Sequence, residues 1–340
     1  MKTRYHGRDF STVLLSSLHC TVQSDVQFHR SPLNPILTAS DWWWESRAVF
    51  NPGAVVHDGR IALVYRAVGS DGLSRFGLAW TTDGDHIEER AELPLYEAAL
   101  DDPWGRLGVE DPRITRIDDA LYVTYCKASV DSADTSPLHW ETAPFRVRSG
   151  IALTRDLKTL QEIGTLMPDV NTKDTVLFPE RIGGRYVALI RQYPAIQLVT
   201  SPDLRVWSAT VPVMDPVPGT WEGERIGAGS PPIRTPWGWL LFYHGNEFLR
   251  MPGNQRLYRT GVAVLDLDEP HRVLYRHPDP ILSPEEPYER EGPVGNVVFV
   301  TGTAEVGERL YLYYGAGDGL IATAWIERDA LWEWLRVRLA

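Results

Sequence analysis

The stretch GVEDPRITRIDDALYVTYC, residues 108–126, has the pattern of two β-strands joined by a tight turn. Apolar and polar residues alternate on both sides of Asp118-Asp119, as expected for a hairpin with one buried face. The first strand begins unusually, because Glu110, Asp111 and Arg113 surround a proline. Two adjacent acids and an arginine at the start of a strand require an explanation beyond strand pairing.

Similar strand–turn–strand units recur at four other places in the chain. Their turns are predicted at Asp58-Gly59, at Gly183-Gly184, near 236–238 and near 306–307, so successive turns lie 53 to 70 residues apart. Most units continue into a strand with the pattern Gly-[Ile/Leu/Val]-Ala or a close variant. Five units of three or four strands predict an all-β fold, a five-bladed β-propeller. A β-sandwich is the alternative, but sandwiches seldom show such self-similarity.

We expect the propeller to occupy residues 1–340 as a single domain with an N-terminal extension over about 1–45. Helical spacing occurs only in the tail, at about 327–338, where Leu331, Trp334 and Leu335 fall on one face. The N-terminus has only a short apolar patch, and no run approaches the roughly 18 apolar residues of a membrane span. The expected location is therefore cytoplasmic, without a membrane partner.

Charge and composition argue against several other partners. A net charge of −11 argues against a nucleic acid held through its phosphates. Cys20 and Cys126 make no disulfide framework and lack metal-ligand spacing, so a reduced protein without a metal site is expected. The 13 Trp and 14 Tyr can fill a β-rich core, but such rings also stack on the apolar faces of sugars.

Polar side chains gather at the ends of the first strands of the predicted blades. At one end of a propeller, loops from every blade converge on the central channel and can share a ligand. Each residue alone has a structural alternative, as a turn cap, a surface charge or a satisfied core histidine. Their coincidence in blade after blade favours a common site. They include Asn51, Arg66, Glu110, Asp111, Arg113, Lys173, Asp174, Arg191, Arg225, Tyr243, His244 and Asp318.

The motifs that carry these residues resemble those of glycoside hydrolase family 130, the β-mannoside phosphorylases and β-mannosidases. The resemblance runs from about residue 50 to 325, and the family's fold is a five-bladed propeller. It depends on eight motifs in order: NPGA (51–54), VYRA (64–67), GVEDPRI (108–114), KDTVLFPERIGGRYV (173–187), IGAGSPPI (226–233), GWLLFYHG (238–245), NVVF (296–299) and YYGAGD (313–318).

The resemblance implies a single-step, inverting attack on a β-mannosidic bond. The acid would be Asp111, whose proton would reach the leaving oxygen through a hydroxyl of the mannose, while Arg113 would hold the acid or the substrate. Glu110 would brace the loops from behind. The substrate-binding residues that match the family's motifs are Asn51, Arg66, Asp318, Glu110 and Tyr243.

In the phosphorylases of this family the nucleophile is inorganic phosphate, the co-substrate, and the product is α-mannose 1-phosphate. Phosphate is already anionic, so it needs cations rather than a base. The matching cations are Arg191, Arg225 and His244. Two departures from the family pattern stand out: Arg225 replaces a common lysine, and Gln192-Tyr193 separates Arg191 from its usual proline.

Two other functions remain open at this point. Inverting hydrolysis uses one acid and one base, and Glu222 or Glu224 in WEGER (221–225) is a candidate base for a β-mannosidase. A non-catalytic carbohydrate-binding propeller is the third possibility, although it has no need for Asp111 together with a basic cluster.

The sequence leaves the linkage open between β-1,2 and β-1,4, and the acceptor open among glucose, mannose and N-acetylglucosamine. We assign acceptor choice to loops at 41–46, 130–145 and 246–258. Trp42 to Trp44 in the first loop favour core packing over a sugar platform. We expect no cofactor besides phosphate, and the aromatic-rich termini favour a homo-oligomer.

Overall fold

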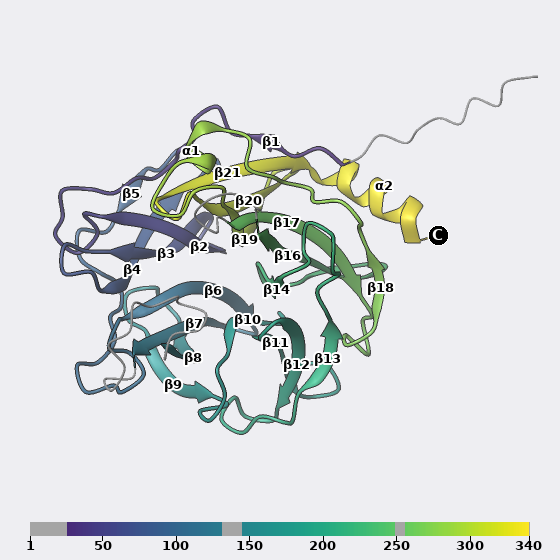
Figure 1. The fold of residues 1–340 in the computed structure, drawn as a ribbon, viewed down its shortest axis with the longest axis horizontal. Helices are drawn as coiled ribbons and strands as arrows, with labels where there is room; N and C mark the ends of the chain where they lie inside the picture. The colour runs from purple at the N-terminus through teal and green to yellow at the C-terminus, as the bar shows by residue number, and fades with distance from the viewer. Residues whose placement is uncertain (1–25, 131–144, 249–255, 340) are drawn as a thin grey trace, which may run out of the picture.

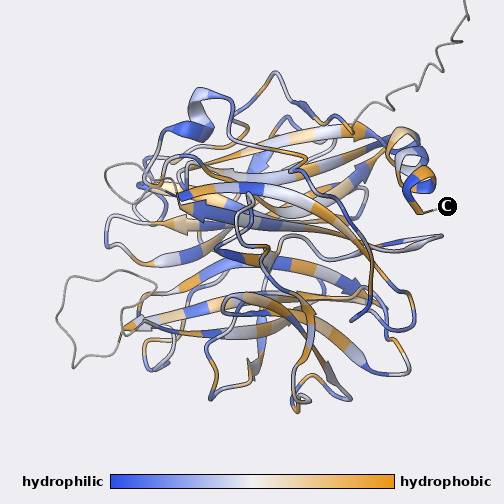
Figure 2. Ribbon diagram, turned by 45° about the vertical axis from the view of Figure 1, so that its right-hand side comes forward, coloured by the Kyte–Doolittle hydropathy of each residue, from blue (hydrophilic) through white to orange (hydrophobic). Residues whose placement is uncertain are grey.

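The computed structural model describes residues 26–130, 145–248 and 256–339. Its strands form five separate sheets that surround a central channel, which confirms the five-bladed β-propeller (Figure 1). Apolar and polar residues are mixed along the strands (Figure 2), and many strands are buried along most of their length, because each sheet packs against a neighbouring sheet on both faces.

The first three blades are built from consecutive antiparallel strands, ordered from the channel outward. Blade 1 contains β2 (Ala48–His57), β3 (Arg60–Val68), β4 (Ser74–Thr81) and β5 (Glu89–Arg90). Blade 2 contains β6 (Val109–Ile117), β7 (Ala120–Val130), β8 (Phe145–Thr154) and β9 (Gln161–Leu166). Blade 3 contains β10 (Lys173–Leu177), β11 (Tyr186–Gln192), β12 (Ala195–Ser201) and β13 (Val211–Met214).

The last two blades each depart from this simple order. Blade 4 splits its inner strand into β14 (Arg225–Ala228) and β15 (Ile233–Thr235), followed by β16 (Gly238–Phe248), β17 (Arg256–Leu265) and β18 (Val273–Arg276). Blade 5 contains β19 (Val298–Val306), β20 (Arg309–Ala316) and β21 (Leu320–Glu327), and its outer strand is β1 (His29–Arg30).

Strand β1 closes the ring, because the N-terminal part of the chain pairs with the C-terminal blade. His29 lies opposite Trp325, and Arg30 lies opposite Ala324. Part of the expected N-terminal extension therefore belongs to the propeller itself, and residues 1–25 lie outside the described part.

The C-terminal helix α2 (Arg328–Leu339) packs against the outer side of blades 4 and 5. Leu331, Trp334 and Leu335 are its buried residues, as the helical spacing predicts. The short helix α1 (Pro287–Arg290) was not predicted, and it carries the buried Glu289. Within the described ranges, no helix combines the length and apolar character needed to cross a bilayer.

Three blades share a buried tyrosine–glutamate–arginine triad. A tyrosine hydroxyl of the second strand donates to a glutamate that precedes the inner strand, and an arginine of the outer strand pairs with the same carboxylate. In blade 4, the Tyr243 hydroxyl lies 2.7 Å from Glu222 Oε2, and Arg276 Nη2 lies 2.7 Å from the same oxygen. The equivalent sets are Tyr65, Glu45 and Arg90 in blade 1, and Tyr314, Glu289 and Arg30 in blade 5.

The Gly-x-Ala pattern follows from the packing of these tyrosines. Tyr65 lies opposite Gly77 on the next strand, and a Cβ added at Gly77 would lie 2.2 Å from the tyrosine ring. Tyr243 lies in the same way against Gly261. The repeated glycine therefore makes room for a ring that lies flat across the neighbouring strand.

Tyr243 thus belongs to the scaffold of blade 4, and it does not line the cavity described below. We expect Tyr243→Phe to lower the free energy of unfolding by about 1–3 kcal/mol, because Glu222 and Arg276 lose a buried partner. The KM for a sugar substrate should not change. Urea unfolding and steady-state kinetics, with Tyr65→Phe as the matched variant, check this. A raised KM for the sugar at unchanged stability would instead show that Tyr243 contributes to substrate binding.

Candidate functional site

The inner strands of blades 1, 2 and 3 share one backbone irregularity. Pairing shifts after Phe50 in β2, after Glu110 in β6 and after Lys173 in β10. The next residue in each strand adopts a positive φ angle, which Asn and Asp tolerate better than other side chains. These residues are Asn51 (49°), Asp111 (51°) and Asp174 (50°).

The second strands supply equivalent positions beside these bulges. Arg66, Arg191 and His244 lie directly opposite Phe50, Lys173 and Gly227 on the inner strands of blades 1, 3 and 4. Bulge residues and their neighbours therefore meet at one end of the channel.

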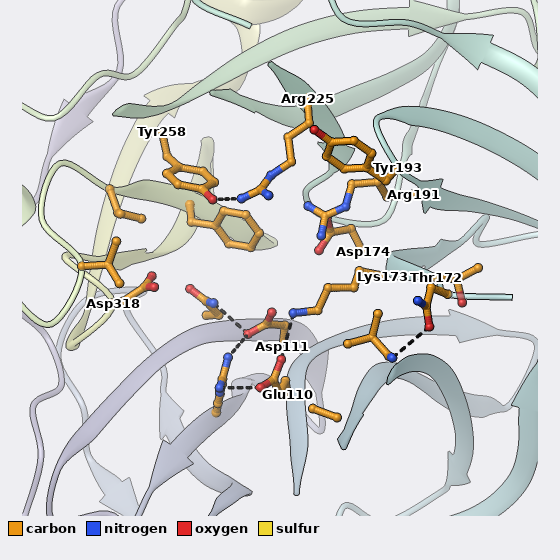
Figure 3. Close-up of a pocket in the computed structure, with 18 residues that line it drawn as sticks. Glu110, Asp111, Thr172, Lys173, Asp174, Arg191, Tyr193, Arg225, Tyr258 and Asp318 are labelled. Atoms are coloured by element: carbon orange, nitrogen blue, oxygen red, sulfur yellow. Dashed lines mark hydrogen bonds and ion pairs between the residues drawn. The ribbon is translucent and has the colours of Figure 1, made fainter. Parts of the chain in front are cut away.

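A cavity of about 400 Å³ opens at this end. Glu110 and Asp111 lie on one side of it, with Arg191 and Arg225 on the opposite side and Asp318 at a third (Figure 3). Its wall consists of Asn51, Arg66, Glu110, Asp111, Ala128, Val147, Asn171, Thr172, Lys173, Asp174, Arg191, Tyr193, Arg225, Tyr258, Val294, Val297, Phe299 and Asp318.

Asp111 is the buried carboxylate on the acid side of the cavity. Its Oδ1 accepts hydrogen bonds from Asn51 Nδ2 at 2.8 Å and from Arg66 Nη1 at 3.3 Å. Burial alone would raise the pKa of Asp111, but the charges of Arg66, Lys173 and Arg113 outweigh burial and lower it. These neighbouring cations therefore hold Asp111 as an anion.

Glu110 braces the two cations next to Asp111. It accepts from Arg66 Nη2 at 2.7 Å and from Lys173 Nζ at 2.9 Å. Arg66 is thereby held between two carboxylates, and Lys173 is held on the cavity wall.

Arg113 lies beneath the cavity and is almost completely buried. Its Nη1 donates to the backbone oxygen of Asp111 at 2.7 Å, its Nη2 to Asp174 Oδ1 at 3.2 Å and its Nε to the backbone oxygen of Gly229 at 3.1 Å. The arginine of the opening stretch therefore ties blades 2, 3 and 4 together and fixes the backbone of Asp111.

Asp174 pairs with basic residues on the side of the cavity opposite Asp111. Arg191 Nη1 lies 2.7 Å from its Oδ2, and His244 Nε2 lies 3.3 Å from the same atom. Burial would raise the pKa of Asp174, but Arg191, His244 and Arg113 hold it well below its usual range. A Cβ at Gly227 would lie 2.4 Å from Asp174 Oδ2, so only glycine permits this approach.

His244 lies behind Asp174 and is not part of the cavity wall. Its ring packs against Phe299 with centroids 4.2 Å apart, and burial lowers the pKa of His244 despite the neighbouring carboxylate. The His244 imidazole therefore supports Asp174 in its neutral form, whereas the family resemblance implied a cation in contact with phosphate.

Arg225 forms the far wall of the cavity beside Tyr258. Its Nη2 contacts the Tyr258 hydroxyl, and its guanidinium carbon lies 5.4 Å from the centre of the tyrosine ring. Arg191 and Arg225 thus present two guanidinium groups to the cavity from adjacent blades.

Asp318 is the acid of the cavity wall contributed by blade 5, and it also has a positive φ angle, 49°. Burial raises its pKa to about 7; Arg66 opposes this shift and Asp111 adds to it. The two aspartates therefore differ in charge below neutral pH, with Asp111 ionised and Asp318 protonated.

This shift predicts a specific dependence of stability on pH. Between 3.8 and about 7, folded Asp318 retains a proton that the unfolded chain has released, so its contribution to stability falls as pH rises. In Asp318→Asn that slope is absent, and the variant should gain stability relative to wild type between pH 4 and pH 7.5. Urea midpoints at both pH values measure this, with Asp119→Asn at an exposed turn as the control. Parallel curves would contradict the assignment.

Seven of the nine predicted site residues line the cavity, and the other two, Tyr243 and His244, lie behind its wall. The prediction left Lys173, Asp174, Tyr193 and Tyr258 without a role. Lys173 and Asp174 could have been found, since they occupy the positions of Glu110 and Asp111 in the next blade.

The loops predicted to choose the acceptor fall partly on residues 131–144 and 249–255, which lie outside the described residues. The tryptophan run is described and lies away from the cavity. Trp44 is buried, and the exposed Trp43 packs on Arg75. Among the described residues, no three His, Cys, Asp or Glu side chains gather as metal ligands.

Comparisons with known proteins agree with this geometry. The family model described as β-1,4-mannooligosaccharide phosphorylase, glycoside hydrolase family 130, matches residues 31–337. The chain is 36% identical to the 1,2-β-oligomannan phosphorylase of Thermoanaerobacter sp. (strain X514), over 84% of this chain and 91% of that protein. It is 32% identical to the β-1,4-mannooligosaccharide phosphorylase of Ruminococcus albus, over 90% of both chains.

A solved structure shows the same architecture. The β-1,2-mannobiose phosphorylase of Listeria innocua, in complex with β-1,2-mannobiose, superposes with a TM-score of 0.76 at 26% identity, over 92% of this chain and all of the other. The match to the family model covers most of the sequence and includes every residue of the cavity wall. The chain therefore belongs to glycoside hydrolase family 130.

Proposed function

We propose that this protein is an inverting β-mannoside phosphorylase that releases α-mannose 1-phosphate. The observation that carries the proposal is the division of one cavity between the carboxylate of Asp111 and the guanidinium groups of Arg191 and Arg225. The relatives named above support it, because they are phosphorylases of β-linked mannosides.

The mannose would lie between these two sides. Asn51, Arg66 and Asp318 offer amide, guanidinium and carboxyl groups to its hydroxyls, a set with both donors and acceptors. Asp111 would supply the proton to the leaving oxygen through a mannose hydroxyl, as the family resemblance implies.

Phosphate would bind Arg191 and Arg225, with Lys173 nearby, and attack C1 from the face opposite the leaving oxygen. The new bond to phosphate forms as the glycosidic bond breaks, and the leaving sugar takes the proton. A bound phosphate anion would also raise the pKa of Asp111, since its charge would offset the cations that keep Asp111 ionised. Phosphate would therefore prepare the acid for its task.

The geometry does not favour the hydrolase alternative. Glu222 is buried in the triad of blade 4, bound to Tyr243 and Arg276. Glu224 is not part of the cavity wall, and its Oε1 lies 3.5 Å from the Tyr193 hydroxyl. Neither carboxylate therefore lines the cavity, which supports phosphate over water as the nucleophile.

We propose β-1,2-linked manno-oligosaccharides as the first substrates to test, since the β-1,2-active relative is 36% identical and the β-1,4-active one 32%. The test incubates the enzyme with β-1,2- and β-1,4-mannobiose, with and without phosphate, and follows the products by ¹H and ³¹P NMR. We expect phosphate-dependent formation of α-mannose 1-phosphate, faster from the β-1,2 substrate. Free mannose appearing equally fast without phosphate would overturn the proposal.

A further inference from the structure

Tyr193 is a residue of the cavity wall to which the steps proposed above give no task. The hairpin between β11 and β12 turns at Tyr193 and Pro194, since Gln192 and Ala195 pair with each other on either side of them. Tyr193 is largely exposed, although it lines the cavity. An aromatic side chain at a hairpin tip therefore forms a border between the cavity and the solvent.

Contacts with blade 4 fix the position of this hairpin tip. The backbone N–H of Ile226 donates to the backbone oxygen of Pro194 at 3.0 Å. The Tyr193 hydroxyl lies 3.5 Å from Glu224 Oε1. Glu224 and Ile226 are the two neighbours of Arg225 in the chain. The tip of the blade 3 hairpin is therefore held directly beside the segment that carries Arg225.

The Tyr193 ring lies on the cation side of the cavity. In Figure 3 the ring is beside Arg191 and Arg225, across the cavity from Asp111. Arg191 is 8% exposed and Arg225 is 1% exposed, whereas Tyr193 is 62% exposed, so the ring lies closer to the solvent than the guanidinium groups. A phosphate bound to these arginines would have the mannose on one side and this ring on the side of the solvent.

We propose that Tyr193 is the outer wall of the phosphate site and restricts the nucleophile to an unsubstituted tetrahedral oxyanion. This inference rests on the proposed function and adds to it a residue that selects the nucleophile. The ring would occupy the space into which an organic substituent on the anion has to point when the sugar fills the other side. It would also keep water away from the guanidinium groups, which strengthens their attraction for phosphate.

Inhibition by phenylphosphonate tests this selection, because its three oxygens can contact arginine as those of phosphate do, but it also carries a phenyl ring. The release of α-mannose 1-phosphate is measured at a saturating concentration of the preferred mannobiose, so that the sugar side of the cavity is occupied. Tyr193→Ala should lower the inhibition constant of phenylphosphonate, relative to the KM for phosphate, about 10-fold, because a steric clash is removed. The KM for the disaccharide should stay at the wild-type value.

Three controls distinguish selection of the anion from a general change of the protein. Tyr193→Phe should discriminate like wild type, since the ring and not the hydroxyl fills the space. Arsenate has the shape and charge of phosphate, so the ratio of its inhibition constant to the KM for phosphate should be the same in all variants. Trp43→Ala removes an exposed aromatic side chain outside the cavity wall and should leave the discrimination unchanged.

A binding measurement separates this inference from the proposed function. Calorimetry in the presence of D-mannose compares the binding of inorganic phosphate and phenylphosphonate without turnover. If the enzyme makes no α-mannose 1-phosphate, but wild type prefers phosphate and Tyr193→Ala loses that preference, the proposed function fails and the selection by Tyr193 stands. If the enzyme is an active phosphorylase and Tyr193→Ala keeps the wild-type discrimination in both kinetics and calorimetry, the selection by Tyr193 is wrong.

Discussion

Asp111→Asn should lower kcat/KM for phosphorolysis of the mannobiose about 10²- to 10⁴-fold, the usual contribution of a general acid. The amide retains the size of the carboxyl and still accepts from Asn51 and Arg66, but it has no proton to transfer. Initial rates of α-mannose 1-phosphate release measure the loss.

A substrate with a better leaving group sharpens this test. An activated aryl β-mannoside needs less protonation of its leaving oxygen, so Asp111→Asn should lose far less activity on it than on the disaccharide. Asp119→Asn, in the same hairpin but at an exposed turn, should match wild type on both substrates. An equal loss on both substrates would indicate that Asp111 has a structural role instead.

Removal of a phosphate-binding arginine should weaken the binding of phosphate much more than the binding of the disaccharide. A hydrogen bond to a charged group contributes about 1.5–3 kcal/mol, so Arg191→Ala or Arg225→Ala should raise the KM for phosphate roughly 10- to 150-fold. Initial rates at varied phosphate and saturating disaccharide measure this effect.

A lysine at position 225 distinguishes the effect of the positive charge from the effect of the guanidinium geometry. Arg225→Lys keeps the charge but cannot form two parallel bonds, so its KM for phosphate should lie between those of wild type and Arg225→Ala. Arg234→Ala removes a solvent-exposed partner of Glu180 and should change nothing. A proportional rise in the KM for disaccharide in the Arg225 variants would argue against a dedicated phosphate site.

The repeats carried most of the fold prediction. Alternating strands with turn residues between them recur five times, and each gave a blade, because a strand with one buried face needs a partner at regular intervals. Strand β1 escaped notice because two residues are too few to show a pattern. Its place in blade 5 depends on pairing with a segment almost 300 residues away.

The site prediction was limited by which way neighbouring side chains point. Tyr243 and His244 are adjacent in a regular part of β16, without the bulge that lets Glu110 and Asp111 both reach the cavity, so their side chains face opposite sides of the sheet. Tyr243 faces the triad, and His244 faces Asp174. A comparison of blades would have revealed the triad, since Trp-Glu precedes the inner strand at both Trp44-Glu45 and Trp221-Glu222.

The central claim is that one mannose lies between the acid and the phosphate cations. A crystal structure of the protein with mannose and phosphate tests it most directly. We predict phosphate in contact with the guanidinium groups of Arg191 and Arg225, and a mannose ring between it and Asp111 that touches Asn51 and Asp318. Phosphate bound outside this cavity, or a mannose whose C1 faces away from the arginines, would contradict the account.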